Sequence, residues 1–245
     1  MYNFFIKDGF CGDTVTLSGA DFNHVKNVLR MKEGDDLLIS HDGKSSLCSI
    51  KEFLSETVVL SVIREDYAET ALPINVILFQ GLPKSDKLEL IIQKTVELGV
   101  CSITPVAMKR SIVKIDDKKK KSKTERWQAI AEAAAKQSKR TAVPQVNEVL
   151  SYKEMLNLAK DLDLLLVPYE CADGMAATKQ ALSQIKSGMS VGIVIGPEGG
   201  FEQKEIDLAL EVGGKVISLG SRILRTETAA ITATAMCMLY SEMEL

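Results

Sequence analysis

Two short glycine-containing loops carry the residues best suited to bind a small molecule. The stretches are IGPEGGF (195–201) and LGSRILRTETAA (219–230), and each follows an apolar run and leads into a helical pattern. Gly196 and Gly220 lack a side chain, so the backbone there can approach a ligand closely or adopt a positive φ. Neither the G-x-G-x-x-G pattern nor a following Gly-Lys-Ser/Thr is present, so the common nucleotide fingerprints are missing.

Two carboxylates set the charge of the first loop. Glu198 and Glu202 flank the start of the helix that follows it. They occupy the positive helix end that a phosphate would otherwise use. The loop therefore suits a neutral or cationic ligand, although an ordinary strand-to-helix turn with acidic capping explains the same residues.

The second loop places cations where a helix disfavours them. Arg222 and Arg225 precede a helix that starts near residue 226, and a positive charge at a helix N-terminus opposes the helix dipole. We therefore expect Arg225 to have a partner, which could be Glu198, Glu227 or a bound anion.

Strands alternating with helices must position both loops. From residue 74 onward, apolar runs alternate with helical patterns, which predicts a parallel sheet with helices on both faces. Ligands bind outside the carboxyl ends of such strands, where both loops would lie. The helix between the loops has only about a dozen residues, so we expect their two strands to be neighbours. VPYE (167–170) is the candidate third wall.

Local patterns also predict where helices begin. Asp86 with Glu89 has the spacing of a capping box, as does the S-x-x-E pattern that begins at Ser151. Thr124 is the expected N-cap of an alanine-rich helix. Gly99 is the expected stop of the helix that follows Asp86.

Residues 1–66 are expected to form mainly β structure. The exception is a helix over 21–30, with Val25, Val28 and Leu29 on one face. A polar segment ending in Pro73 reads as a linker, which divides the chain into domains 1–70 and 71–245. The strands expected in the first domain are 15–19, 36–40, 46–50 and 57–63.

Charge is distributed unevenly along the chain. Residues 109–140 hold twelve Lys or Arg against four acids, a surplus of eight positive charges. Because the net charge of the whole chain is −3, the other residues together carry −11. A basic block in an acidic protein indicates a polyanionic partner. A solvated lysine segment that promotes solubility is the alternative.

The composition excludes several classes of protein. No run of 18 apolar residues occurs, and the N-terminus has no basic and apolar leader, so we expect neither a membrane span nor secretion. The five cysteines are scattered and there are only two histidines, which argues against a disulfide framework and against a metal site. A reducing cytoplasm is the simplest location.

The C-terminal helix is unusual because no residue between Glu227 and Glu242 is charged. The stretch is too short to span a bilayer, so it is expected to be buried. Ala, Met and Thr cover every side of it, which favours a subunit interface over a core helix with one apolar stripe.

The paired loops together resemble the signature of the SPOUT-superfamily RNA methyltransferases, and more narrowly that of the RsmE family, which methylates N3 of a uridine in 16S ribosomal RNA. The resemblance runs essentially end to end. Besides the two loops, it rests on the blocks HVKNVLRMKEGD (24–35), KSDKLELIIQKTVELGV (84–100) and ERWQAIAEAAAKQSKR (125–140).

The resemblance implies an α/β fold in which a PUA-like β-barrel domain precedes a SPOUT domain with a trefoil knot. It implies S-adenosylmethionine as cofactor, and the sulfonium of that molecule suits a loop lined by carboxylates. It also implies 16S ribosomal RNA, or the small ribosomal subunit, as the partner. The enzyme would be a homodimer that associates through the knot and the C-terminal helix, with no metal and no membrane.

The same resemblance carries roles onto individual residues. Arg225 would handle the substrate. The resemblance supplies no agreed general base; Glu198 is the one carboxylate available nearby for that role, unless it pairs with Arg225. The expected cofactor-binding residues are Val167, Pro168, Ile195, Gly196, Pro197, Gly200, Leu219, Gly220, Ile223, Leu224 and Thr228. The expected RNA-binding residues are Arg30, Lys32, Lys84, Lys109, Arg110, Arg126, Lys136, Lys139 and Arg140.

Three rival functions remain open from the sequence. The first is an RNA-binding assembly factor of the same fold without activity, against which the intact glycines of both loops argue. The second is a nucleotide-dependent enzyme, against which the missing fingerprints argue. The third is a methyltransferase of the same superfamily that acts on transfer RNA or on a ribose hydroxyl.

Overall fold

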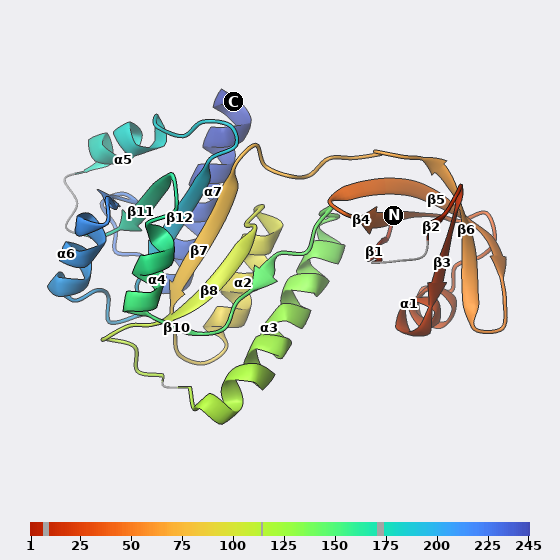
Figure 1. Cartoon of the computed structure of the whole chain (residues 1–245), viewed down its shortest axis with the longest axis horizontal. Helices are drawn as coiled ribbons and strands as arrows, with labels where there is room; N and C mark the ends of the chain where they lie inside the picture. The colour runs from red at the N-terminus through yellow and green to blue at the C-terminus, as the bar shows by residue number, and fades with distance from the viewer. Residues whose placement is uncertain (7–9, 114, 171–173) are drawn as a thin grey trace. The chain divides into compact units, whose positions relative to one another are not determined.

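The computed structural model describes residues 1–6, 10–113, 115–170 and 174–245. Lys114 and Cys171, which entered the charge and cysteine counts, lie outside the described residues. The chain forms two compact units (Figure 1). The first unit contains Met1–Ala71 together with Ala135–Val143, and the second contains Leu72–Ala134 and Pro144–Leu245. The segment 135–143, which sequence analysis placed in the second domain, therefore belongs to the first unit.

The first unit is a six-stranded sheet in the order β1-β4-β5-β6-β3-β2. All neighbouring pairs are antiparallel except β1 and β4, which are parallel. The four expected strands are present, and β1 and β2 are additions that the sequence did not indicate. The strands are β1 (Asn3–Phe5), β2 (Phe10–Cys11), β3 (Thr14–Ser18), β4 (Asp36–His41), β5 (Lys44–Phe53) and β6 (Thr57–Arg64).

One face of this sheet buries alternate residues, such as Val15 and Leu17 of β3. The expected helix over 21–30 is α1 (Gly19–Asn23) followed by a π-helical turn, η1 (His24–Val28). In that turn the Leu29 N–H donates to the His24 carbonyl, five residues back. The wider turn breaks the 3.6-residue spacing, so the prediction for Val28 is wrong: its side chain is 63 % exposed, while Val25 is fully buried.

The second unit has a seven-stranded sheet in which every pair is parallel, as predicted. The strands follow the order β10-β8-β7-β12-β11-β13, and β9 also pairs with β8. The strands are β7 (Asn75–Gly81), β8 (Ser102–Ala107), β9 (Gln145–Val146), β10 (Leu150–Ser151), β11 (Leu164–Pro168), β12 (Ser190–Ile195) and β13 (Lys215–Ile217).

The two strands that lead into the glycine loops are not neighbours, contrary to expectation. Strand β12 lies between β7 and β11, and β13 pairs with the far side of β11, with Val167 opposite Val216. A short helix therefore does not join adjacent strands here, because the connection from β12 to β13 passes over β11. The loop after β11 consequently lies between the other two loops.

Helices cover both faces of this sheet, and Figure 1 shows α4 and α7 on opposite sides. Helix α7 packs against α2 and against β7 and β12, whereas α4 packs against α6 and β8. Helix α5 was not predicted from the sequence. The helices are α2 (Lys87–Glu97), α3 (Asp117–Gln137), α4 (Tyr152–Ala159), α5 (Met175–Leu182), α6 (Gln203–Glu211) and α7 (Thr226–Glu244).

The helix starts agree with the sequence at Ser151 and at Thr226, where α7 begins, but the caps expected at Asp86 and Thr124 are not formed. Ser151 and Glu154 form the expected capping box. Asp86 makes no side-chain cap, because its backbone is not extended (φ −87°, ψ 10°). Helix α3 begins at Asp117, so Thr124 lies inside it and is not its N-cap. The lysines before Thr124 are good helix formers and extend the helix.

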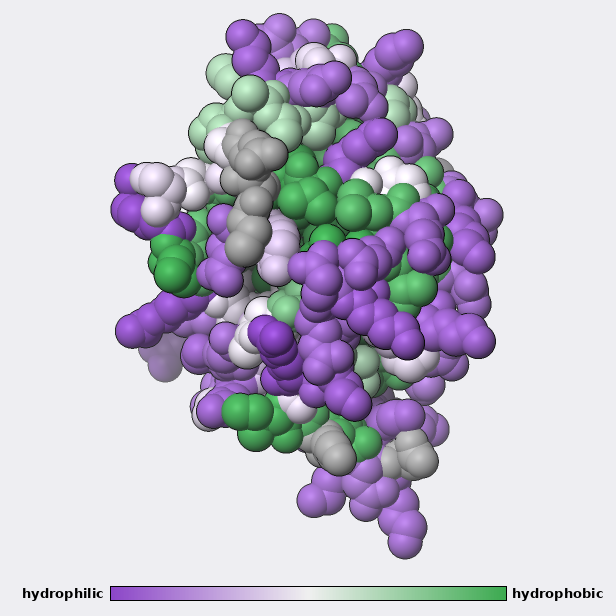
Figure 2. All heavy atoms as spheres, turned by 90° about the vertical axis from the view of Figure 1, so that its left-hand side faces the viewer, coloured by the Kyte–Doolittle hydropathy of each residue, from purple (hydrophilic) through white to green (hydrophobic). Residues whose placement is uncertain are grey.

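The face of the second unit that carries α5 and α6 has a mixed character. Figure 2 shows hydrophobic residues gathered at the centre of this face, with hydrophilic residues around them. Met175 of α5 and Leu210 of α6 are both about half exposed. No described helix is long and apolar enough to cross a membrane.

Candidate active site

A cavity of about 760 Å³ opens in the second unit where β11, β12 and β13 end. Three loops line it, namely those after each of these strands, together with the first residues of α7. Its volume lies within the range of about 300–1,000 Å³ that is usual for small-molecule sites. The loops that sequence analysis selected thus form walls of one cavity, and residues 168–170 supply a further wall.

Most of the expected cofactor-binding residues line this cavity, and so do Glu198 and Arg225. Two expected residues do not. Val167 is fully buried in the core of the sheet. Thr228 is exposed on α7, where it lies two residues beyond Thr226 and points to nearly the opposite side of the helix. The expected residues that line the cavity are Pro168, Ile195, Gly196, Pro197, Gly200, Leu219, Gly220, Ile223 and Leu224.

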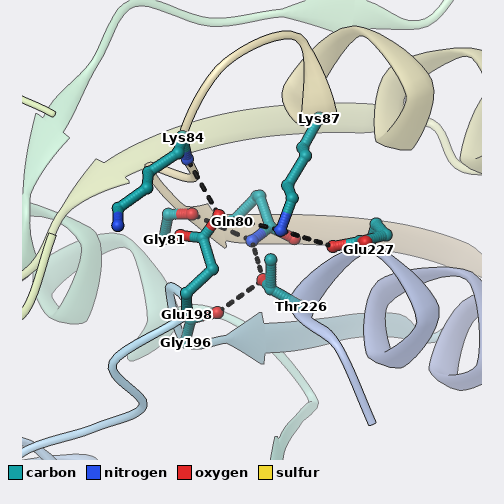
Figure 3. Close-up of polar contacts among 8 residues, drawn as sticks. All are labelled: Gln80, Gly81, Lys84, Lys87, Gly196, Glu198, Thr226 and Glu227. Atoms are coloured by element: carbon teal, nitrogen blue, oxygen red, sulfur yellow. Dashed lines mark hydrogen bonds and ion pairs between the residues drawn. The ribbon is translucent and has the colours of Figure 1, made fainter. Parts of the chain in front are cut away.

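Thr226 joins the two glycine loops through buried hydrogen bonds (Figure 3). Its hydroxyl donates to the Gly196 carbonyl oxygen at 2.7 Å and accepts from Nε2 of Gln80 at 2.9 Å. The same nitrogen donates to the Gly81 carbonyl oxygen at 2.9 Å. Gln80 and Thr226 are both buried, so these bonds hold the end of β12 against the start of α7.

Replacing Thr226 with valine should lower the free energy of unfolding by about 1–3 kcal/mol, because the buried Gln80 amide and the Gly196 carbonyl each lose a partner. Urea denaturation measures this change. Thr228→Val is the matched control, since Thr228 is exposed on the same helix. Equal losses in the two variants would contradict the role assigned to Thr226.

Lys87 connects the same two loops by charge (Figure 3). Its Nζ lies 3.1 Å from Oε1 of Glu198 and 3.4 Å from Oε2 of Glu227, so it forms an ion pair with each carboxylate. The backbone N–H of Lys84 also donates to Oε1 of Glu198, at 3.0 Å. We call Lys87, Glu198 and Glu227 the Lys87 triad. Sequence analysis missed Lys87, which also lines the cavity.

Lys87 and Glu198 keep their charges through the neutral pH range. Partial burial alone would raise the pKa of Glu198, but hydrogen bonds from the Lys84 N–H, its own backbone and Lys87 together lower it. The hydrogen bond to Glu198 raises the pKa of Lys87, and the charge of Glu227 adds to the effect. Stability from Glu198 is lost only as the pH falls below about 4.3, and stability from Lys87 only as it rises above about 10.4.

The side chains of the two arginines of the second loop have no hydrogen-bond or ion-pair partner among the residues that the structure describes. Arg225 has an extended backbone, and its carbonyl accepts the first bond of α7 from the Ala229 N–H at 2.8 Å. Glu198 and Glu227, the two protein partners expected for Arg225, contact Lys87 instead. A bound anion is the expectation that remains.

Helix α5 stabilises the second loop through hydrogen bonds between Thr178 and Ser218. The Thr178 hydroxyl donates to the Ser218 carbonyl oxygen at 2.8 Å and accepts from the Ser218 N–H at 2.9 Å. The Gly220 N–H donates to the Ser218 hydroxyl at 3.1 Å, and Gly220 has a φ of +106°. The loop thus needs glycine at position 220, because side chains disfavour that conformation.

Comparison with known proteins identifies the family. The family model described as RNA methyltransferase domain matches residues 70–238, and that of the RNA methyltransferase PUA domain matches residues 17–52. Ribosomal RNA small subunit methyltransferase E of Bacillus subtilis (strain 168) is 40 % identical over 94 % of this chain and 91 % of its own length. The chain belongs to the ribosomal RNA small subunit methyltransferase E family. The resemblance inferred from the two loops is thereby confirmed.

Two solved structures are also similar to this chain. A ribosomal RNA small subunit methyltransferase E from Neisseria gonorrhoeae, bound to S-adenosyl methionine, is 29 % identical with a TM-score of 0.82, and the match covers 98 % of this chain and 97 % of that one. A putative methyltransferase from Legionella pneumophila, in complex with the same cofactor, is 30 % identical with a TM-score of 0.83, and 97 % of each chain is covered. The expected combination of a parallel-sheet SPOUT-type domain and a PUA-like domain is confirmed.

The basic residues singled out as RNA contacts differ in how available they are. Arg126 is paired with Glu89 at 2.8 Å, and Lys136 lies 3.5 Å from Asp21. Arg140 is only 8 % exposed, so its side chain is not presented to RNA. The expected contacts with exposed side chains are Arg30, Lys32, Lys84, Lys109, Arg110, Arg126 and Lys139.

In this member of the family, Lys109 and Arg110 support the first glycine loop. The Lys109 N–H donates to Oε1 of Glu205 at 3.0 Å, and the Glu202 N–H donates to Oε2 of the same carboxylate at 2.9 Å. Nη1 of Arg110 donates to the Gly199 carbonyl oxygen at 3.0 Å. Arg110 thereby also lines the cavity. Among the described residues, no group of three His, Cys, Asp or Glu could hold a metal ion.

Proposed function

We propose that this protein transfers a methyl group from S-adenosylmethionine to N3 of a uridine in 16S ribosomal RNA. One observation carries the proposal: both glycine loops line a single cavity of suitable volume, in a chain whose relatives are bound to that cofactor. The family name of the relatives supports the small-subunit RNA as substrate.

The cavity fits the cofactor in chemistry as well as in size. Its walls combine apolar residues such as Leu219 and Leu224 with the carboxylate of Glu198, a combination suited to a nucleoside that also carries a positive sulfonium. A Cβ added at Gly196 would lie 3.2 Å from the Phe201 ring, so the glycine leaves room that a side chain would remove. When bound, S-adenosylmethionine supplies the methyl group.

Arg225 is the residue best placed to hold the uracil. Methylation at N3 replaces the N3 proton, so negative charge develops on the uracil oxygens as that proton leaves. The Arg225 guanidinium lies in the wall of the cavity and has no ion-pair or hydrogen-bond partner among the described residues, so it can stabilise such charge. The rest of the catalysis is the positioning of N3 toward the methyl group.

Glu198 is a weak candidate for the general base. Its lowered pKa makes it a poor proton acceptor, and its Oε1 accepts bonds from Lys84 and Lys87. We therefore assign Glu198 to holding the loop in place.

The proposal includes a homodimer that forms through α7 and the knotted region. Helix α7 supports it, because Leu239 in its uncharged stretch and Met243 just beyond Glu242 are exposed, at 49 % and 71 %. We infer a cytoplasmic location from the RNA substrate.

The test is calorimetric titration with S-adenosylmethionine, with NAD and ATP as controls, followed by mass spectrometry of small-subunit RNA incubated with protein and cofactor. We expect saturable binding of the methyl donor alone and a methylated uridine at N3. If the protein binds the cofactor but methylates transfer RNA or a ribose hydroxyl, the assigned substrate is wrong and that alternative takes its place. Absence of cofactor binding would favour an RNA-binding assembly factor.

The exposed lysines at the start of α3 should contribute to RNA affinity through phosphate contacts. In a plot of log affinity against log salt concentration, replacing Lys118 and Lys119 with glutamine should reduce the magnitude of the slope by about 1.5. This change corresponds to two lost phosphate contacts. Lys179→Gln with Lys186→Gln is the matched control, because both side chains are exposed on or beside α5. Equal slopes for wild type and the α3 variant would assign those lysines to solubility alone.

A further inference from the structure

We propose that Lys87 is a positioning residue that holds the Glu198 carboxylate and so leaves Arg225 available to the substrate. This inference rests on the proposed function, because it gives a further residue of the same site its role. Neither the loop motifs nor the helix pattern of α2 indicated it.

The two loops are close enough for Glu198 and Arg225 to compete for each other. The Thr226 hydroxyl is 2.7 Å from the Gly196 carbonyl oxygen, so the loops touch one residue from Arg225 and two residues from Glu198. Both side chains line the same cavity. An arginine and a carboxylate that face one cavity attract each other, and partial burial of the Glu198 side chain, which is 25 % exposed, strengthens that attraction.

Lys87 prevents that pairing in this structure. Its Nζ reaches Glu198 at 3.1 Å and Glu227 at 3.4 Å, and the Lys84 N–H fixes the same Glu198 oxygen from the other side. Figure 3 shows Glu198 and Glu227 approaching the Lys87 amine from different segments of the chain. Glu198 and Glu227, the two carboxylates expected as partners of Arg225, are therefore already paired with another cation.

Burial makes the arrangement sensitive to the loss of Lys87. The side chains of Glu198 and Glu227 are 25 % and 14 % exposed, so neither carboxylate is fully hydrated. Without Lys87, two partly buried negative charges would lack a cation, which is unfavourable. Arg225 lies in the wall of the same cavity with no ion-pair partner in the described part of the chain, and Glu198 would turn to it. The guanidinium would then be neutralised before RNA arrives.

The deciding experiment compares Lys87→Met with the double variant Lys87→Met/Glu198→Gln. We expect Lys87→Met to lower kcat/KM for RNA by about tenfold while S-adenosylmethionine affinity changes by less than about threefold. Adding Glu198→Gln removes the charge that would capture Arg225, yet keeps an oxygen for the Lys84 N–H. The double variant should therefore recover most of the lost rate.

Two further variants serve as controls. Lys94→Met removes another ion-paired lysine of α2, which contacts Glu97 at 2.9 Å, and should leave kcat/KM unchanged. Lys87→Arg keeps the cation and should retain most activity. If Lys87→Met does not fold, Lys87→Gln is measured with and without Glu198→Gln in the same way.

The possible outcomes separate this inference from the proposed function. A wild-type protein that methylates no RNA would overturn the function. An active wild type whose Lys87 variant is not improved by Glu198→Gln, or is as active as wild type, would overturn the role of Lys87. A Lys87→Met variant that mainly loses cofactor affinity would also overturn it, because Lys87 would then serve the cofactor.

Discussion

Replacing Gly220 with alanine should weaken S-adenosylmethionine binding by about 10- to 100-fold. Gly220 has a φ of +106°, and a non-glycine residue in that conformation costs about 1–3 kcal/mol. The loop would relax away from that φ and move the neighbouring Leu219 and Leu224, which line the cavity. Gly196→Val should have an effect of similar size, because its side chain would meet the Phe201 ring within the cavity. Calorimetric titration of each variant measures the loss.

A second glycine with a positive φ provides the control for general destabilisation. Gly188 has a φ of +83° and no heavy atom within 4 Å of an added Cβ, and it does not line the cavity. Gly188→Ala should lower thermal stability about as much as Gly220→Ala but leave cofactor affinity near the wild-type value. If the two variants bind the cofactor equally well, the second loop does not form part of its site.

Arg225→Ala should reduce the rate of methylation by about 10²–10³ while cofactor affinity stays within a few-fold of wild type. The loss corresponds to removal of one charged donor from a preorganised site, and Arg225 has no partner among the described residues whose loss would unfold the loop. Single-turnover methylation of small-subunit RNA, with saturating cofactor, measures this rate.

Arg222→Ala is the comparison for charge alone, since Arg222 is exposed in the same loop and lines the same cavity. We expect it to weaken RNA binding at low salt with a smaller effect on the rate. Similar rate losses in both variants would mean that the loop contributes general positive charge and that Arg225 has no specific role at the uracil.

The parts of the fold that depend on local pattern were predictable. Periodic apolar residues indicated the helices other than α5 and most of the parallel strands, and the chemistry of the glycine loops located the cavity. What failed depended on packing between distant segments. Strand β13 pairs with β11 and not with β12, and no spacing within the chain records which edge of the sheet a strand joins. Val28 failed because a single π-turn shifts the helix face.

The glycines that shape the backbone of the site could be predicted from the sequence, but the ion-pair partners of its charged side chains could not. Gly196 and Gly220 were found from residue type, whereas Lys87 was missed although a signal existed. Lys87 is a cation in the first turn of α2, an unfavourable position with respect to the helix dipole. The same argument singled out Arg225. Its partner could not be inferred, because Glu198 lies 111 positions away from Lys87 in the sequence.

Residues 135–143 belong to the first unit although they follow residues 72–134 of the second unit, and this affects how the protein folds during synthesis. Asn3 and Ser40 are buried there; the Asn3 amide donates to the Arg140 carbonyl oxygen at 2.9 Å, and the Ser40 hydroxyl donates to the Asn3 side-chain oxygen at 2.9 Å. A nascent chain that has emerged only to residue 71 contains all six strands of this unit but lacks the acceptor for Asn3. Domains that are continuous in sequence fold from the N-terminus as they leave the ribosome. Here the N-terminal unit has to wait for about seventy further residues of its neighbour before its last buried hydrogen bonds can close.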